Sequence, residues 1–287
     1  MNVTTGRRRA TTAIAAGAVL IGVGATTIAV AQPSDTTTTA APVITVTQAK
    51  GQLTVSPGTT VQPGKVTIEY TAVKGDHTLQ AAAIAKGYTS KQFGKDVNVG
   101  LNKGNLKAVR RLDSKVAWLG GTESIAGKTG SFTTVLAPGT VFLFDQNSEV
   151  RTTLTVTGDT RTGAAPEAAA TAIVTKKLHW NTPATLPRDG WINLRNNSTE
   201  PHLFVLQRVK ESTTPKKVRA FIKKGAQGEP PWGLKATVES GVFSPGTQTQ
   251  LHVHLPAGKY ILICFWPSKK NGMPHFMMGM WKLLHLK

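Results

Sequence analysis

An internal repeat is the strongest constraint on the fold of this chain. The segment LAPGTVFLFDQ, which begins at Leu136, aligns without gaps with LPAGKYILICF, which begins at Leu255. Further upstream, VQPGKVTIEYTAVKGDHTLQ resembles LPRDGWINLRNNSTEPHLFV in its order of strand, polar turn, histidine and strand. A period of about 115 to 120 residues that occurs twice is too long for a solenoid and indicates a duplicated domain.

Each half of the repeat consists of short apolar runs separated by glycine and proline. Apolar and polar residues alternate from Val66 to Thr71, which is the period of a half-buried strand. The alternation fades between 87 and 112, where we expect a short helix or an irregular excursion. About seven short strands per half predict an all-β protein of two tandem Greek-key β-sandwiches. We place the domains at 43–157 and 171–287, joined by a linker at 158–170.

The first 31 residues have the pattern of a signal peptide. Three arginines at 7–9 precede an uncharged run at 10–30, and Ala-Val-Ala at 29–31 is a small-x-small cleavage site. Export by the general or the twin-arginine route leads to a secreted or cell-envelope protein, with residues 32–42 as a flexible linker. If the leader stays uncleaved, its uncharged run is long enough to anchor the chain in a membrane.

The chain is strongly basic, and its charge is uneven. The formal net charge is +19, and residues 171–287 carry 17 Lys+Arg against 5 Asp+Glu. The segment TPKKVRAFIKK, which begins at Thr214, predicts a short basic helix with three apolar residues on its inner face. Such a field favours an anionic partner, either a redox protein or a component of the cell envelope, or it keeps an exported protein soluble. We expect no nucleic acid partner for an exported chain.

Sulfur is concentrated at the C-terminal end. Cys264 is the only cysteine, and four of the five methionines follow it within sixteen residues: Met273, Met277, Met278 and Met280. His275 lies among them. A lone cysteine in an exported protein is either buried and inert or occupied by a metal. Thiolate, thioether and imidazole together are the ligands that copper prefers.

Two segments of the second half resemble the cupredoxins, the blue copper family that includes plastocyanin. One is NNSTEPH, from Asn196 to His202, which is similar to the loop that supplies the first histidine ligand. The other is PAGKYILIC followed by the H-x-x-x-G-M ending, from His275 to Met280. The resemblance implies two tandem cupredoxin-like sandwiches after the signal peptide, and one mononuclear copper in the second. It implies His202, Cys264 and His275 as a trigonal plane and Met280 as the axial ligand.

The spacing between Cys264 and His275 departs from the family pattern, because ten residues separate them instead of two to four. The segment from Pro267 to Pro274 either bulges out as a hairpin and leaves the ligands together, or the site has changed. In the second case copper is lost, or Met273 or Met277 replaces a ligand. If copper is lost, Cys264 is a core residue of a sandwich without metal.

The first half lacks this set of residues. Asp145 stands where the second half has Cys264, and no methionine is present. His77 aligns with His202, but without visible partners we interpret it as an ordinary surface histidine. We therefore expect the first sandwich to have no metal ligands.

The sequence predicts copper binding for electron transfer or copper handling, and no enzyme activity. One H-x-H pair, His252 and His254, falls short of the repeated pairs that a trinuclear oxidase cluster needs, and its histidines are expected to face solvent. No hydrolase, nucleotide-binding or zinc-protease motif is present. The alternative function is a cell-surface module without redox activity that holds an anionic polymer through its basic second domain. A weaker third hypothesis is a copper buffer that uses the methionines.

Overall fold

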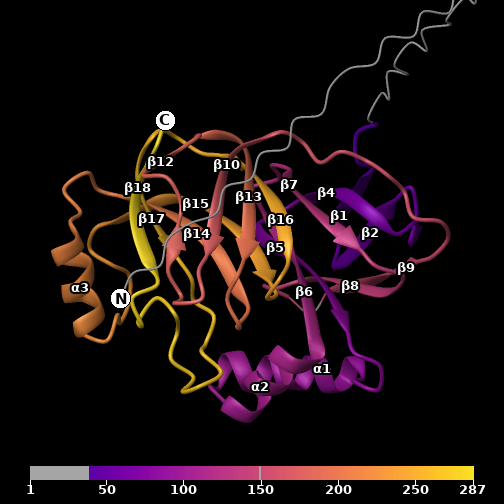
Figure 1. Cartoon of the computed structure of the whole chain (residues 1–287), viewed down its shortest axis with the longest axis horizontal. Coiled ribbons are helices and arrows are strands. Elements are labelled where there is room, and N and C mark those ends of the chain that lie inside the picture. Colours follow the sequence, from indigo (N-terminus) through magenta and orange to yellow (C-terminus); the bar gives the residue numbers. More distant parts are fainter. Residues whose placement is uncertain (1–38, 149) are drawn as a thin grey trace, which may run out of the picture. The chain divides into compact units, whose positions relative to one another are not determined.

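The computed structural model describes residues 39–148 and 150–287, so the predicted leader lies outside the described residues. Within them, no helix combines the length and the apolar character needed to cross a membrane. Strands dominate, and they form two sheets (Figure 1).

The first sandwich runs from 43 to 156. Its elements, in chain order, are β1 (Val43–Ala49), β2 (Gln52–Ser56), β3 (Thr60–Val61), β4 (Gly64–Ala72), β5 (Asp76–Ile84), α1 (Ser90–Val97), the π-helical turn η1 (Asn98–Asn102), α2 (Leu106–Lys115), β6 (Val116–Ile125), β7 (Gly130–Leu136), β8 (Gly139–Asp145) and β9 (Arg151–Val156). One sheet has the order β2-β1-β4-β7 and the other β6-β5-β8-β9-β3. The excursion expected between 87 and 112 is therefore helical.

The second sandwich runs from 168 to 286. Its elements are β10 (Ala168–Val174), β11 (Trp180–Asn181), β12 (Thr185–Leu186), β13 (Asp189–Asn196), β14 (His202–Val209), α3 (Pro215–Lys223), β15 (Gly233–Phe243), β16 (Gln248–His254), β17 (Gly258–Ile263) and β18 (Trp281–Leu286). Its sheets have the orders β11-β10-β13-β16 and β15-β14-β17-β18-β12. The basic segment forms α3 as expected, with Val218 buried and the lysines exposed.

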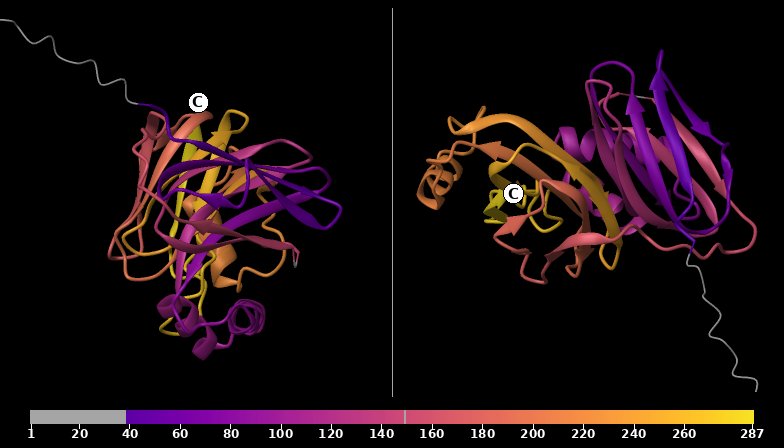
Figure 2. Two further views of the ribbon diagram at one scale, coloured as in Figure 1. Left: turned by 90° about the vertical axis from the view of Figure 1, so that its right-hand side faces the viewer. Right: turned by 90° about the horizontal axis from the view of Figure 1, so that it is seen from above.

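The two sandwiches repeat one topology strand for strand, which confirms the predicted fold class. In each, the first strand pairs in parallel with the fourth strand of its own half: β1 with β4, and β10 with β13. Because β8 pairs with β5 as β17 pairs with β14, Asp145 is the counterpart of Cys264 and His77 is the counterpart of His202. Figure 2 shows the two halves in the colours of the sequence.

Equivalent edge strands of the two sandwiches pair with each other. β6 is antiparallel to β15, and β7 is antiparallel to β16, so each sheet continues from one sandwich into the other. The approach at this seam is close. Gly241 has a φ of 62°, and a Cβ there would lie 2.9 Å from the Cα of Gly121, so this position requires glycine.

The helical excursion of the first sandwich packs against the second. Phe93 of α1 and Leu112 of α2 belong to the same apolar core as Cys264 and Trp266. Arg110 of α2 donates from Nε to the carbonyl of Lys269 at 2.9 Å. The segment that follows Cys264 is therefore held from both sandwiches.

Candidate metal centre

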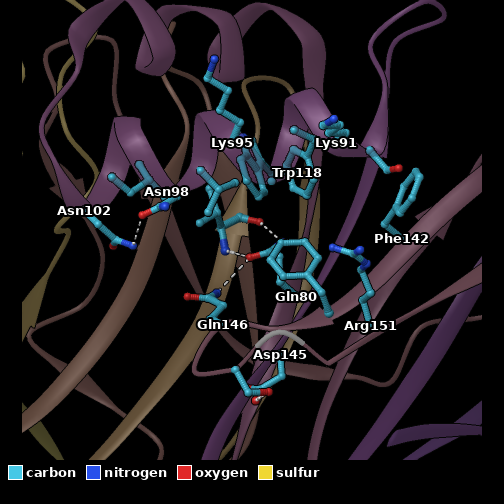
Figure 3. A pocket seen from close by; sticks show the side chains of 18 of the residues that line it. Gln80, Lys91, Lys95, Asn98, Asn102, Trp118, Phe142, Asp145, Gln146 and Arg151 are labelled. Atoms are coloured by element: carbon cyan, nitrogen blue, oxygen red, sulfur yellow. Dashed lines mark hydrogen bonds between the residues drawn. The ribbon is translucent and has the colours of Figure 1, made fainter.

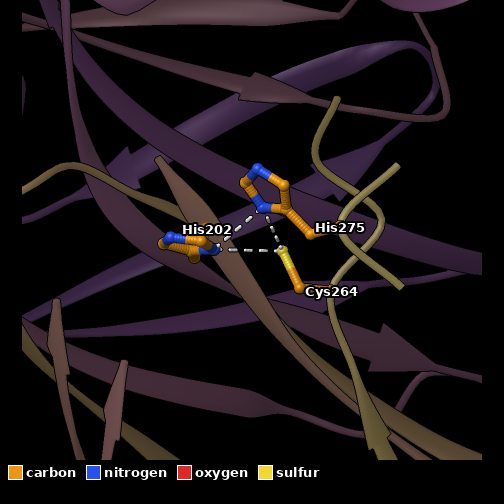
Figure 4. Close-up of side chains that lie close together, drawn as sticks. All are labelled: His202, Cys264 and His275. Atoms are coloured by element: carbon orange, nitrogen blue, oxygen red, sulfur yellow. Dashed lines mark hydrogen bonds between the residues drawn. The ribbon is translucent and has the colours of Figure 1, made fainter. Parts of the chain in front are cut away.

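Three side chains that are far apart in the sequence meet in the interior of the second sandwich (Figure 4). Cys264 Sγ lies 3.4 Å from His202 Nδ1 and 3.6 Å from His275 Nδ1. The two Nδ1 atoms lie 3.1 Å apart. All three residues have 0% solvent exposure, so the triangle of donor atoms is shielded from water.

Strand pairing brings His202 and Cys264 together. His202 is the first residue of β14, and Cys264 directly follows the last residue of β17, the antiparallel neighbour of β14. Apolar runs on both strands keep this part of the sheet buried, so a polar side chain here faces other protein atoms rather than solvent.

A hairpin returns the chain to the site and delivers His275. Pro267 and Pro274 form an antiparallel bridge, and the N–H of Ser268 donates to the carbonyl of Met273 at 2.9 Å. At the base, the N–H of Phe276 donates to the carbonyl of Cys264 at 2.7 Å. The hairpin alternative is therefore confirmed, and the additional residues extend away from the donor atoms.

The histidines are oriented by partners on their outer nitrogens. His202 Nε2 lies 2.8 Å from Ser198 Oγ, and that hydroxyl lies 2.7 Å from Asn196 Oδ1, which can only accept a hydrogen bond. His275 Nε2 lies 3.1 Å from Glu200 Oε2, also an acceptor. Both Nε2 atoms therefore carry a proton, and both Nδ1 lone pairs point towards the centre.

Burial determines the charge state of the donors. It lowers the pKa of His202 to about 2, with the neighbouring His275 as a second cause, so this imidazole is neutral. Burial also raises the pKa of the Cys264 thiol to about 12, which keeps the thiol protonated in the absence of a cation. For Glu200, burial opposes ionisation, but hydrogen bonds from His275 and Lys269 outweigh it and lower the pKa of the carboxyl.

The donor triangle fits one small soft cation. Two imidazole nitrogens whose lone pairs face each other at 3.1 Å repel unless a positive charge lies near them. An ion in the trigonal plane, about 2.0 Å from each nitrogen and about 2.3 Å from sulfur, would separate the nitrogens by about 3.5 Å and each nitrogen from sulfur by about 3.7 Å. The donor separations are only slightly shorter than these values, so a small expansion of the triangle admits the ion.

Met280 is buried in the same core as Cys264, with 1% exposure, and its N–H donates to the carbonyl of His275 at 2.9 Å. The turn from His275 to Met280 therefore brings the backbone of this fourth predicted residue next to that of His275. The other methionines lie further outside: Met273 and Met278 are exposed, and Met277 is partly buried.

Residues that support the ligands were missed by the sequence analysis. Glu200 accepts hydrogen bonds from the N–H of Lys269 at 2.9 Å and from Ser268 Oγ at 3.4 Å, so it joins the loop before β14 to the hairpin. Asn196 Nδ2 donates to the carbonyl of Glu200 at 2.8 Å. Asn196 belongs to the motif that identified His202, but nothing in the sequence singled out Ser198 or Glu200.

The first sandwich has a polar cluster at the equivalent position. His77 Nδ1 lies 2.8 Å from Asp145 Oδ2, and Gln48 Nε2 lies 3.2 Å from the same oxygen. Tyr70 and Ser148 also donate hydrogen bonds within this cluster. The interpretation of His77 as an ordinary surface histidine was wrong, because its side chain is only 23% exposed and its Nδ1 lies within hydrogen-bond distance of a buried carboxylate.

The histidine pair of β16 points outward as expected, while Leu251 and Val253, which alternate with the histidines along the strand, are buried. Asp189 Oδ1 lies 3.3 Å from His254 Nδ1 and 3.6 Å from His252 Nε2. These three side chains form a partly exposed polar cluster on the surface of the second sandwich.

No protein-family model matches this sequence, and no curated protein matches it. Among solved structures, auracyanin A, a blue copper protein from Chloroflexus aurantiacus, shows 17% identity over 40% of this chain and 98% of its own, with a TM-score of 0.29. The Cu-containing nitrite reductase of Thermus scotoductus shows 11% identity over 85% of this chain and 61% of its own, with a TM-score of 0.22. The blue copper oxidase of Nitrosomonas europaea shows 10% identity over 85% of this chain and 84% of its own, with a TM-score of 0.21.

Overlaps with TM-scores this low carry no argument by themselves, and the assignment of the fold rests on strand order, pairing and the repeated halves. The resemblance of the motifs to those of cupredoxins, the topology and the buried cluster agree with one another. The chain is a tandem of two cupredoxin-like β-sandwiches, the second of which contains a His-Cys-His cluster.

Proposed function

We propose that the second sandwich binds one copper ion through His202, Cys264 and His275, with Met280 as the axial contact. The observation that supports this most strongly is the pair of Nδ1 lone pairs that face each other at 3.1 Å beside a buried thiol. Soft sulfur with imidazole nitrogens favours copper over magnesium, calcium or manganese.

The proposed role is transfer of single electrons, or the handling of copper itself. A copper ion held by these donors would gain and lose one electron. The chain's own residues keep the donor atoms fixed in both states: Ser198 and Glu200 hold the imidazole rings, and the hairpin holds His275 against Cys264. A site that is rigid and shielded from water needs little rearrangement when the charge changes.

A matched pair of variants tests the assignment. His202→Gln and His77→Gln alter equivalent positions of the two sandwiches, so they control for general effects of removing an imidazole. Equilibrium dialysis of the full chain against copper should give about one tightly held ion for the native protein and for His77→Gln, and none for His202→Gln. Equal copper binding by both variants would contradict the proposal.

The exposed face of α3 supports a proposal about the partner. Lys216, Arg219 and Lys223 are exposed on this helix, and so is Lys224, which follows its last residue. We propose that these cations attract an anionic partner, which is a redox protein or an anionic polymer of the cell envelope. Retention of the chain on dextran sulfate should fall with added salt and fall further in Lys216→Gln/Lys223→Gln. Retention that is independent of both would rule out this role for α3.

We also propose that the leader directs export. Expression of residues 1–287 in a bacterial host should then yield a chain that begins at Gln32 outside the cytoplasm, as measured by intact mass. An intracellular chain that retains residues 1–31 would contradict this.

A further inference from the structure

A cavity of about 740 Å³ opens between the helical excursion and the outer face of β8 (Figure 3). Its lining includes Phe93, Gly94 and Asn98 from α1 and η1, Phe142 and Phe144 from β8, and Arg151 at the start of β9. This volume is typical of pockets for small organic ligands. The cavity lies outside the His-Cys-His cluster and contains none of its donor atoms.

One wall of the cavity is aromatic because of the pleat of β8. Val141, Leu143 and Asp145 turn into the sandwich, so Phe142 and Phe144 turn outward, where α1 only partly covers them. The ring of Phe93 lies 5.5 Å from that of Phe144 and 5.8 Å from that of Trp118.

The aromatic wall continues into the second sandwich. Trp118 meets Trp266 edge to face at 5.4 Å, and both indoles line the cavity. Trp118, Trp266 and Phe93 are nearly fully buried and support Phe142 and Phe144 from behind. The pocket thus offers the partly exposed rings of Phe142 and Phe144 in fixed orientations, against which a flat ligand can stack without ordering side chains first.

The charged groups at the cavity favour an anion. Lys91, Lys95 and Arg151 line it and are exposed, and Figure 3 shows the guanidinium of Arg151 extending inward. Among the described lining residues the only carboxylate is Asp145, which is buried and already paired with His77 at 2.8 Å. Amide groups of Asn98, Asn102 and Gln146 add hydrogen-bonding capacity beside these cations.

From the fixed aromatic wall and the unbalanced cations, we infer that this cavity is a binding site for a small planar aromatic carboxylate. Stacking on the phenyl rings of Phe142 and Phe144 holds the flat part, and Arg151 with the two lysines receives the carboxylate. A small inorganic anion would leave the aromatic wall unused, and a neutral hydrocarbon would leave the cations unused. The site requires no metal and is independent of the copper proposal.

The ligand class is tested with three probes on the metal-free full chain by isothermal titration calorimetry. We expect 2-naphthoate to bind saturably with one site per chain. The neutral 2-naphthamide and the non-aromatic cyclohexanecarboxylate should each bind at least fivefold more weakly. Equal binding of the amide or of the saturated acid would overturn the inference, and so would the absence of saturable binding by 2-naphthoate.

The position of the site is tested at Gly94, which lies in α1 and lines the cavity. A Cβ added there meets no atom within 4 Å, so a larger residue enters empty space and also favours the helix. Gly94→Leu should abolish 2-naphthoate binding with no loss in melting temperature, whereas Gly94→Ala should keep most of it. Unchanged binding by Gly94→Leu would place the ligand elsewhere and overturn the inference.

The role of charge is tested at Arg151. Arg151→Gln should weaken 2-naphthoate binding about fivefold, the upper range for one exposed ion pair. Lys74→Gln removes an exposed charge that does not line the cavity and should leave the affinity unchanged. Equal effects of the two variants would show only a general influence of net charge and would contradict a specific role for Arg151.

Discussion

Glu200 Oε2 lies 3.1 Å from His275 Nε2 and places a buried negative charge directly behind a proposed copper ligand. The carboxylate fixes the ring with its Nδ1 towards Cys264. It also contributes charge to the centre, because hydrogen bonds from His275 and Lys269 outweigh burial and lower the pKa of the Glu200 carboxyl. A fixed negative charge stabilises the more positive state of a bound ion.

We therefore predict that Glu200→Gln raises the reduction potential of copper bound at the proposed site. The expected increase is on the order of 100 mV. This is the electrostatic effect on the bound ion of removing one unit charge that lies a few ångströms beyond the His275 ring, at an effective dielectric constant of about 20. A redox titration followed by visible absorption measures it. Glu211→Gln, which removes an exposed carboxylate of the same sandwich, should leave the potential unchanged. A lower potential in Glu200→Gln would contradict the assigned role.

The polar cluster of the first sandwich predicts acid sensitivity. Burial opposes ionisation of Asp145, but hydrogen bonds from Ser148, Asn147, His77 and Gln48 together lower its pKa. A carboxyl with a lowered folded-state pKa contributes stability above its unfolded pKa, and this contribution is lost as the pH falls through the folded pKa. Asp145→Asn should cost about 1–3 kcal/mol of unfolding free energy at neutral pH.

Urea unfolding at several pH values measures this cost. The difference between native protein and Asp145→Asn should begin to shrink below about pH 4, the ordinary pKa of an unfolded aspartate, and should vanish as the pH falls through the lower folded-state pKa of Asp145. Asp159→Asn alters an exposed carboxylate and should show no such change. A difference that is constant with pH would assign the effect of Asp145→Asn to packing alone.

The seam between the sandwiches predicts the opposite pH dependence. Glu123 of β6 and Glu239 of β15 both have pKa values raised to about 7 by burial, and the Glu239 charge further raises the pKa of Glu123. Their folded-state pKa values exceed the unfolded ones, so stability is present at low pH and is lost as the pH rises from about 4.5 through about 7.

Glu239→Gln should remove part of the loss of stability that occurs as the pH rises. We expect its melting temperature, relative to the native protein, to be higher at pH 8 than at pH 5. The exposed Glu229→Gln should shift neither value. If Glu239→Gln melts below the native protein at pH 8 by the same amount as at pH 5, the carboxyl is not titrating in this window.

The close contact at the seam gives a further test with a matched glycine pair. Gly246→Ala should cost about 1 kcal/mol, because its φ of 74° disfavours alanine while a Cβ meets nothing within 4 Å. Gly241→Ala has a similar conformational cost, but its Cβ would also contact the backbone of Gly121. It should therefore destabilise by at least about 1 kcal/mol more, as measured by urea unfolding. Equal costs would mean that the sandwiches can separate at this point without penalty.

The sequence predicted the features that repeat or that depend on local spacing. The gapless match of the segments at Leu136 and Leu255 is strong because both form a buried strand after the same turn. His202, Cys264 and His275 could be named because their motifs occur in short windows of the chain. The hairpin could be stated only as one of several alternatives, since turn composition does not fix where a loop returns.

Other features depend on contacts between distant segments and could not be predicted. The pairing of β6 with β15 leaves no periodic signal, because an edge strand looks the same whether or not a neighbour covers it. His77 was misinterpreted because Asp145 and Gln48 come from other strands. Glu200 stands at an unspecified position of the motif, and its function becomes visible only when the hairpin returns to it.

The visible absorption spectrum of the full chain loaded with Cu(II), beside that of Cys264→Ser, tests the central claim most directly. Cys264 is fully buried between two imidazoles, so direct contact with copper should produce an intense thiolate-to-copper charge-transfer band at about one ion per chain. We predict that Cys264→Ser loses this band. A native protein without the band, or a variant that keeps it, would contradict a copper site at this cluster.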